Sequence, residues 1–197
     1  MRLVVLILGV LLAGCQLAAN DSAAVSQCSS DNLLANTDFG SSDPAAGLSP
    51  WRGSQHAGET SFRTRVNNGE LTIEKIGTQP WYRLVQAPRA RDLRGESLVF
   101  RAEIRLDLTA DELTHGFTHG GGLQVSVWGD PDPVMGGDRL VFSSTLEHEP
   151  RLGTTDWVEV RVPFAVPSTA TRMSVGFLHQ ANGSMQVRNP GLYRCGS

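Results

Sequence analysis

The sequence contains little lysine and almost no helical periodicity. Basic residues number 17 against 20 acidic ones, and Lys75 is the only lysine. No run or patch of Lys and Arg is present, so nothing in the sequence indicates a nucleic-acid partner. The longest apolar run is about ten residues, whereas a helix that crosses a bilayer needs ~20. These features argue against a nucleic-acid-binding protein, a helical bundle and a membrane-spanning protein.

The sequence also lacks a recognisable catalytic motif. A catalytic site needs a nucleophile, a base and an orienting group within reach of one another, and no such grouping can be found among the five histidines. His115 and His119 are four residues apart, a spacing that binds metal when it lies on a helix. Gly116 and the glycine run 120–122 favour a loop instead. We therefore expect that the protein is not an enzyme.

The apolar run lies at the N-terminus and ends at a cysteine. Residues 3–12 have the length of the apolar region of a signal peptide. Residues 12–15, LAGC, resemble the lipobox of bacterial lipoproteins. This resemblance implies that residues 1–14 are removed, that Cys15 is acylated, and that the protein is anchored in the bacterial cell envelope. Gln16, where an aspartate would favour the inner membrane, points to the outer membrane.

Two or three acyl chains, at ~0.8 kcal/mol per buried CH2, would make a stable anchor. The alternative is an ordinary secretory signal in which Cys15 is incidental.

Residues 15–30 are rich in Ala, Ser, Asn and Asp, which predicts a flexible tether, and 31–197 form one domain by length. Cys28 and Cys195 flank this domain. Because exported proteins fold in an oxidising compartment, we expect these cysteines to form a disulfide, with two free thiols as the alternative. A disulfide needs Cα atoms within about 7 Å of each other, so the two ends of the domain would lie side by side.

The domain is expected to be all-β. In residues 98–106, LVFRAEIRL, five apolar residues alternate with four others, three of which are charged. The same alternation recurs in several shorter segments: 71–73, 123–128, 158–164, 172–177 and 185–187. A period of two with one apolar face predicts half-buried strands. Many such strands separated by Gly, Pro, Asn and Asp predict a β-sandwich or jelly roll.

Several segments also occur in a typical order. Residues 32–40 read NLLANTDFG and are followed by Trp51; residues 154–179 begin TTDWVEVRV; the last strand, 183–194, reads GSMQVRNPGLYR. In this order they resemble jelly-roll carbohydrate-binding modules of the cellulase-associated type, within the galactose-binding-domain-like fold. The resemblance covers about residues 31–194. It implies a sandwich with adjacent N- and C-terminal strands that binds carbohydrate without catalysis.

The resemblance further implies a structural calcium ion, although several acidic positions are changed. Thr37 replaces a glycine of the family, Gly40 stands where a glutamate is common, and Arg188-Asn189 replaces an acidic pair. Calcium takes about six to eight oxygen ligands. Asp38 and Asn189 remain as its candidate ligands.

Two tryptophans are candidates for stacking against a sugar, whereas Trp51 and Trp157 are interpreted as packing residues. A planar ring beside Arg, Glu and Gln suits a polyhydroxyl ligand, because stacking supplies contact area and forked hydrogen bonds fix orientation. Parity along the strands places the candidates opposite the apolar positions. We predict one exposed, saccharide-binding sheet face lined by Trp81, Arg83, Arg101, Glu103, Gln124 and Trp128. A solvated face with incidental aromatics is the alternative.

Two classes of function follow. The first is a membrane-anchored, non-catalytic lipoprotein whose partner is a polysaccharide or envelope glycan. The second is a structural lipoprotein that uses the same fold to contact a protein partner, because a fold does not determine a function.

Overall fold

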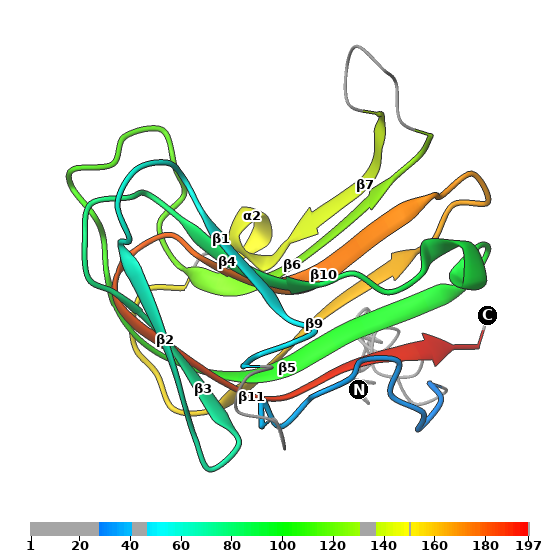
Figure 1. The fold of residues 1–197 in the computed structure, drawn as a ribbon, viewed down its shortest axis with the longest axis horizontal. Helices are drawn as coiled ribbons and strands as arrows, with labels where there is room; N and C mark the ends of the chain where they lie inside the picture. Colours follow the sequence, from blue (N-terminus) through cyan, green and yellow to red (C-terminus); the bar gives the residue numbers. More distant parts are fainter. Residues whose placement is uncertain (1–27, 41–46, 131–136, 150, 197) are drawn as a thin grey trace, which may run out of the picture.

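The chain folds into two antiparallel β-sheets packed face to face (Figure 1). The computed structural model describes residues 28–40, 47–130, 137–149 and 151–196. The predicted signal peptide, Cys15 and most of the predicted tether lie outside this part of the chain. None of the helices in the described ranges is long and apolar enough to cross a membrane. The expected all-β sandwich is confirmed.

The first sheet has five strands in the order β1-β4-β10-β6-β7. Their bounds are β1 Arg52–Gln55, β4 Tyr82–Gln86, β6 Gly121–Trp128, β7 Arg139–Ser144 and β10 Arg172–His179. A short helix, α2 (Thr145–His148), follows β7 and lies on the outer side of this sheet, which bends around it (Figure 1).

The second sheet has the order β2-β3-β11-β5-β8, and β9 also pairs with β5. Its strands are β2 Phe62–Asn67, β3 Glu70–Lys75, β5 Ser97–Thr109, β8 Gly153–Thr154, β9 Val158–Ala165 and β11 Asn182–Cys195. A 3-10 turn, η2 (Ala90–Leu93), precedes β5. The two longest strands, β5 and β11, pair along most of their length.

The core lies between the sheets and is built from the alternating apolar positions. Phe100 and Ile104 of β5 are fully buried, as are Val125 of β6 and Phe177 of β10. Trp51 stacks on Phe177 with a ring-centroid distance of 5.3 Å, and its indole N–H donates to the carbonyl of Asn36 at 2.8 Å. Trp51 is therefore a packing residue, as expected.

The two ends of the domain lie side by side. Cys28 and Cys195 form a disulfide, which confirms the predicted pairing. The amides of Ser29 and Leu33 donate to carbonyls of β11 at 2.7 and 2.9 Å. The side chain of Asn32 accepts from the amide of Leu192 at 3.0 Å. The N-terminal segment thus runs along β11, although Cys28 makes only an isolated bridge there.

Candidate functional site

The outer side of the five-stranded sheet is lined mostly by polar and aromatic side chains. Cross-strand partners share a face, and positions next to a core residue point the opposite way. The registers therefore define the lining of this surface, which we call the concave face: Arg52, Ser54, Arg83, Val85, Gly122, Gln124, Ser126, Trp128, Arg139, Phe142, Ser144, Arg172, Ser174, Gly176 and Leu178.

The centre of the concave face is a floor of small or polar residues. Ser126 is 1% exposed and Gln124 is 7% exposed, although both point away from the core. The amide of Gln124 donates to the hydroxyl of Ser126 at 3.3 Å. Gly176 lies between β4 and β6, where an added Cβ would fall 2.1 Å from the carbonyl oxygen of Leu84. These two buried side chains therefore bond to each other, and the accessible polar groups of the face are those of Arg52, Ser54 and Arg83.

An arginine–aromatic pair lies at each end of the face. At the end of the face where β4 begins, the guanidinium carbon of Arg83 is 5.8 Å from the ring centroid of Trp81. The Nε atom of Arg83 donates to the hydroxyl of Ser54 at 2.9 Å. At the far end of β6, the guanidinium of Arg172 lies 5.0 Å from the ring of Trp128. Next to it, the guanidinium of Arg139 lies 4.2 Å from the ring of the β7 residue Phe142.

These two ends are well separated along the strands. Tyr82 is level with His179 and Gly121, so the preceding residue, Trp81, lies about eight positions from Trp128 in the strand direction. At about 3.3 Å per residue this corresponds to roughly 26 Å. The concave face is therefore long enough for an extended oligomer.

The structure separates the six residues predicted to line one face. Trp81, Arg83, Gln124 and Trp128 belong to the concave face or its edge, whereas Arg101 and Glu103 lie on β5 in the other sheet. The prediction of a single face is wrong for these last two. Alternation shows that a side chain points out of the sandwich, but each of the two sheets has an outer side. The binding role of all six stays a prediction.

The outer side of the six-stranded sheet, which we call the convex face, carries a dense charge network. Glu103 accepts from Arg188 at 2.6 Å and from the Asn189 amide at 3.0 Å. The hydrogen bonds from Asn189 and Arg188 hold the pKa of the Glu103 carboxyl below its ordinary value. Trp157 also lies here, half-buried, with the guanidinium of Arg188 at 4.2 Å and that of Arg105 at 4.9 Å from its ring. Trp157 therefore packs against arginines and takes no part in the core.

The expected calcium ligands, Asp38 and Asn189, line the same surface cavity of about 580 Å³. Arg188 lines it too, and its guanidinium already pairs with Glu103 and, at 3.7 Å, with Glu70. Among the described residues, no group of three or more His, Cys, Asp or Glu is placed to hold a metal. The described residues therefore supply no cluster of carboxylates for calcium at this cavity, and we derive no role for the ion.

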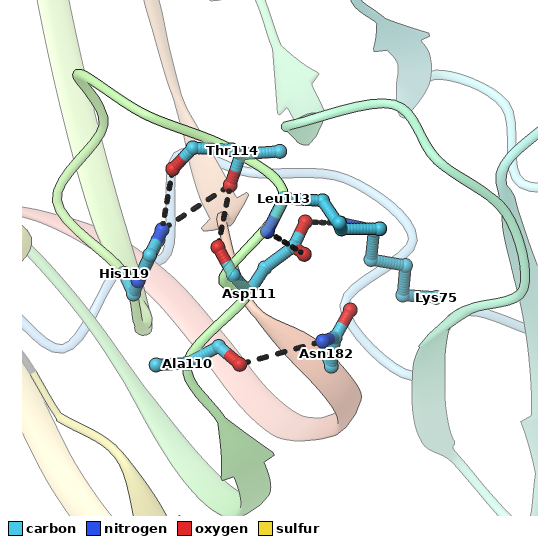
Figure 2. Close-up of polar contacts among 7 residues, drawn as sticks. All are labelled: Lys75, Ala110, Asp111, Leu113, Thr114, His119 and Asn182. Carbon is cyan, nitrogen blue, oxygen red and sulfur yellow. Dashed lines mark hydrogen bonds and ion pairs between the residues drawn. The ribbon is translucent and has the colours of Figure 1, made fainter.

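A buried ion pair anchors the loop between β5 and β6, at the Trp81 end of the concave face (Figure 2). Lys75 pairs with Asp111, and both side chains are almost fully buried. Asp111 also accepts from the amide of Leu113 at 3.1 Å, and its carbonyl accepts from the amide of Thr114 at 3.1 Å. Burial raises the pKa of Asp111, but the hydrogen bonds from Lys75 and Leu113 outweigh it and hold that pKa below its ordinary value.

The same loop is closed on itself by a histidine. The Nε2 atom of His119 lies 3.2 Å from the Thr114 hydroxyl and 3.1 Å from its carbonyl oxygen, as Figure 2 shows. At the loop base the Asn182 amide donates to the Ala110 carbonyl at 3.4 Å. His119 therefore serves the loop's own structure, which agrees with its interpretation as a loop residue.

Neither a protein-family model nor a curated protein sequence matches this chain. Solved structures do match its fold. A putative sugar binding protein from Bacteroides thetaiotaomicron superposes with a TM-score of 0.54 at 11% identity, over 83% of this chain and 100% of that one. A CBM4 module gives 0.51 at 14% identity, over 81% and 98%. The fold resembles carbohydrate-binding jelly rolls.

Two further structures widen this comparison. The xylan-binding domain of CBM22 gives a TM-score of 0.51 at 15% identity, over 85% of this chain and 97% of that one. The enzymatically active domain of tailspike protein 4 from bacteriophage CBA120 gives 0.54 at 14% identity, but the match covers 83% of this chain and only 21% of that one. At such low identities these likenesses establish the two-sheet architecture alone.

Sequence reasoning missed part of the concave face. Arg52 and Ser54 lie on β1, whose four residues include no apolar side chain that could reveal a strand. Phe142 lies on β7, where a register shift between Val127 and Trp128 of the neighbouring strand interrupts the regular pairing. No alternation signal was present in β1, and only pairing with β4 makes it a strand.

Proposed function

We propose that the protein binds carbohydrate through the concave face without catalysing a reaction, and that a lipid on Cys15 holds it at the bacterial cell envelope. The observation that carries the binding function is the arrangement of this face: partly exposed aromatic rings beside arginines at both ends, with the hydroxyl of Ser54 next to Arg83. Sugars present apolar C–H faces to rings and hydroxyls to polar groups. The resemblance to carbohydrate-binding modules supports the same function.

The strands of the concave face supply no acid–base group for catalysis. The five described strands contain no Asp or Glu, and their single histidine, His179, points into the core. On the same side of the sheet, α2 carries the exposed Glu147 and His148. General acid–base catalysis of glycoside cleavage uses such groups. This composition supports binding without catalysis.

The test is a glycan array probed with the purified full-length protein, followed by titration of the best ligand. Trp128→Ala should weaken binding by about 1–3 kcal/mol, the scale of a lost aromatic contact surface. Trp157→Ala is the matched control, because it removes the same ring from the convex face. Melting temperatures measured for both variants would check that they stay folded. Retention of no glycan, or equal losses in both variants, would contradict the proposal.

A further inference from the structure

The concave face is cationic although the chain as a whole is acidic. Its five strands contain four arginines, Arg52, Arg83, Arg139 and Arg172, and no carboxylate. The net charge of the chain is −3. The strands of this sheet thus carry positive charge with no carboxylate among them, and the neighbouring helix α2 adds one carboxylate, Glu147.

On the convex face, in contrast, arginines are matched with glutamates. Arg63 and Arg65 share Glu74 at 2.8 and 2.9 Å, and Arg101 reaches Glu159 at 3.5 Å. Arg161 also pairs with Glu159, and Arg188 pairs with Glu103. The hydrogen bonds and charges from Arg63 and Arg65 hold the pKa of Glu74 below its ordinary value. Most guanidinium groups of the convex face are therefore engaged in ion pairs within the protein.

Three arginines of the concave face lack such partners. Among the described residues, no carboxylate forms an ion pair with Arg52, Arg83 or Arg139. Arg83 donates to the hydroxyl of Ser54 and lies near the ring of Trp81, and Arg139 lies over Phe142. Asp138 directly precedes Arg139 in the chain but is not ion-paired with it. Most guanidinium donors of these three side chains therefore stay open to a ligand.

The spacing of these arginines suits a charged polymer. Arg52 faces Val85 and Arg83 faces Ser54, so the two arginines are diagonal neighbours on paired strands, roughly 7–8 Å apart at their Cα atoms. Arg139 lies at the opposite end, beside Trp128. Each end thus combines a ring with a guanidinium. This repetition fits a ligand that carries negative charge at intervals.

We propose that the ligand of the concave face is an anionic glycan, whose carboxylate or sulfate groups contact Arg52 and Arg83 at one end and Arg139 at the other. This inference rests on the proposed carbohydrate-binding function. A guanidinium binds carboxylate and sulfate oxygens through two parallel N–H donors, which is stronger than a neutral hydrogen bond. Because salt screens charges beyond about 8 Å, the acidic residues elsewhere do not cancel this local attraction.

The test uses two matched pairs of probes with the full-length protein. Polygalacturonate is compared with its carboxyl-reduced form, which keeps the chain and loses the charge, and dextran sulfate is compared with dextran. The charged member of at least one pair should bind more tightly, and added NaCl should weaken that binding. The pair that responds distinguishes a carboxylate from a sulfate ligand.

Variants then locate the contact. Arg52→Gln and Arg83→Gln should each weaken binding of the charged glycan about tenfold, the lower range for a lost charged hydrogen bond. Arg52 is exposed, so its replacement tests the inference even if Arg83→Gln lowers stability. Arg161→Gln removes the same charge from the convex face and should leave binding unchanged.

Three results would overturn the inference. Equal binding of charged and uncharged forms would overturn the anionic class but leave the proposed function intact. Equally tight binding of a DNA oligonucleotide would show general attraction of polyanions in place of a glycan site. Binding of none of the four probes, together with an empty glycan array, would overturn both the inference and the proposed function.

Discussion

Lys75 and Asp111 form an ion pair inside the protein, where their side chains are only 3% and 5% exposed. The pair joins the end of β3 to the loop between β5 and β6 (Figure 2). A buried charge that loses its partner keeps its desolvation penalty, whereas a pair replaced by apolar groups loses both penalties together. The stability of this loop therefore depends on the two charges being present or absent together.

Asp111→Ala should lower the free energy of unfolding by about 3 kcal/mol, because it leaves the Lys75 ammonium buried without a partner. The double variant Lys75→Met with Asp111→Leu should recover most of that loss. Urea denaturation measures both. Glu74→Gln, which removes exposed ion pairs to Arg63 and Arg65, is the control. A loss for Asp111→Ala no larger than for this control would show that the pair contributes little.

Stability should fall in mild acid because of His179. This side chain is fully buried against Phe62, and neither of its ring nitrogens has a hydrogen-bond partner among the described residues. Burial, together with the nearby charge of Lys75, lowers its pKa from 6.5 to about 4, and the backbone of Gly183 opposes this shift. Between these two pKa values the unfolded chain binds more protons than the folded one.

The contribution of His179 to the free energy of unfolding is therefore complete above about pH 6.5. It is lost as the pH falls toward 4, a difference of about 3 kcal/mol. Denaturation at a series of pH values measures it. His179→Phe should flatten the profile across this window, whereas the exposed His148→Gln should keep the wild-type slope. A wild-type slope in His179→Phe would assign the acid sensitivity to other groups.

The disulfide should contribute strongly to stability. It closes a sequence separation of 167 residues, and the chain-entropy model assigns about 5 kcal/mol to a loop of this length. Replacing both Cys28 and Cys195 by Ser should lower the free energy of unfolding by up to that amount. Mass spectrometry of an unreduced digest should show the two cysteine peptides joined. Free thiols at both positions would contradict the bridge.

Membrane association should depend on Cys15. Because the LAGC segment resembles a lipobox, Cys15→Ser should leave the chain unprocessed or release it from membranes. Cell fractionation and intact-mass measurement check this, with Gln16→Ser as a neighbouring control. A Cys15→Ser protein that fractionates with membranes at its mature mass would exclude the lipid anchor.

The alternation of apolar residues predicted much of the fold. The segments around Phe100, Val125, Val160 and Val175 are strands whose apolar residues face the core. This succeeds because the side-chain direction in a strand has a period of two whatever the strand pairs with. The disulfide was also predictable, since two cysteines flanked the domain.

Sheet membership was not predictable in the same way. Arg101 and Gln124 both point outward, yet β5 pairs with β11 while β6 pairs with β10. Such pairings join residues far apart in sequence, and no local pattern encodes them. The candidate site was therefore found only in part: its tryptophans follow from parity, whereas the contribution of Arg52 depends on the pairing of β1 with β4.

The Cys28–Cys195 bridge also determines how the domain would carry a mechanical load. A pull on the N-terminal side enters at Cys28 and passes through the bridge into the end of β11. Without the bridge, a pull on the N-terminal side would break the backbone hydrogen bonds between the segment after residue 28 and β11 one after another. With it, the force enters the end of β11, which pairs with β5 there and with both β3 and β5 further along the strand. A load on the N-terminal side is therefore transmitted to a central strand of the six-stranded sheet instead of to the short segment that follows Cys28.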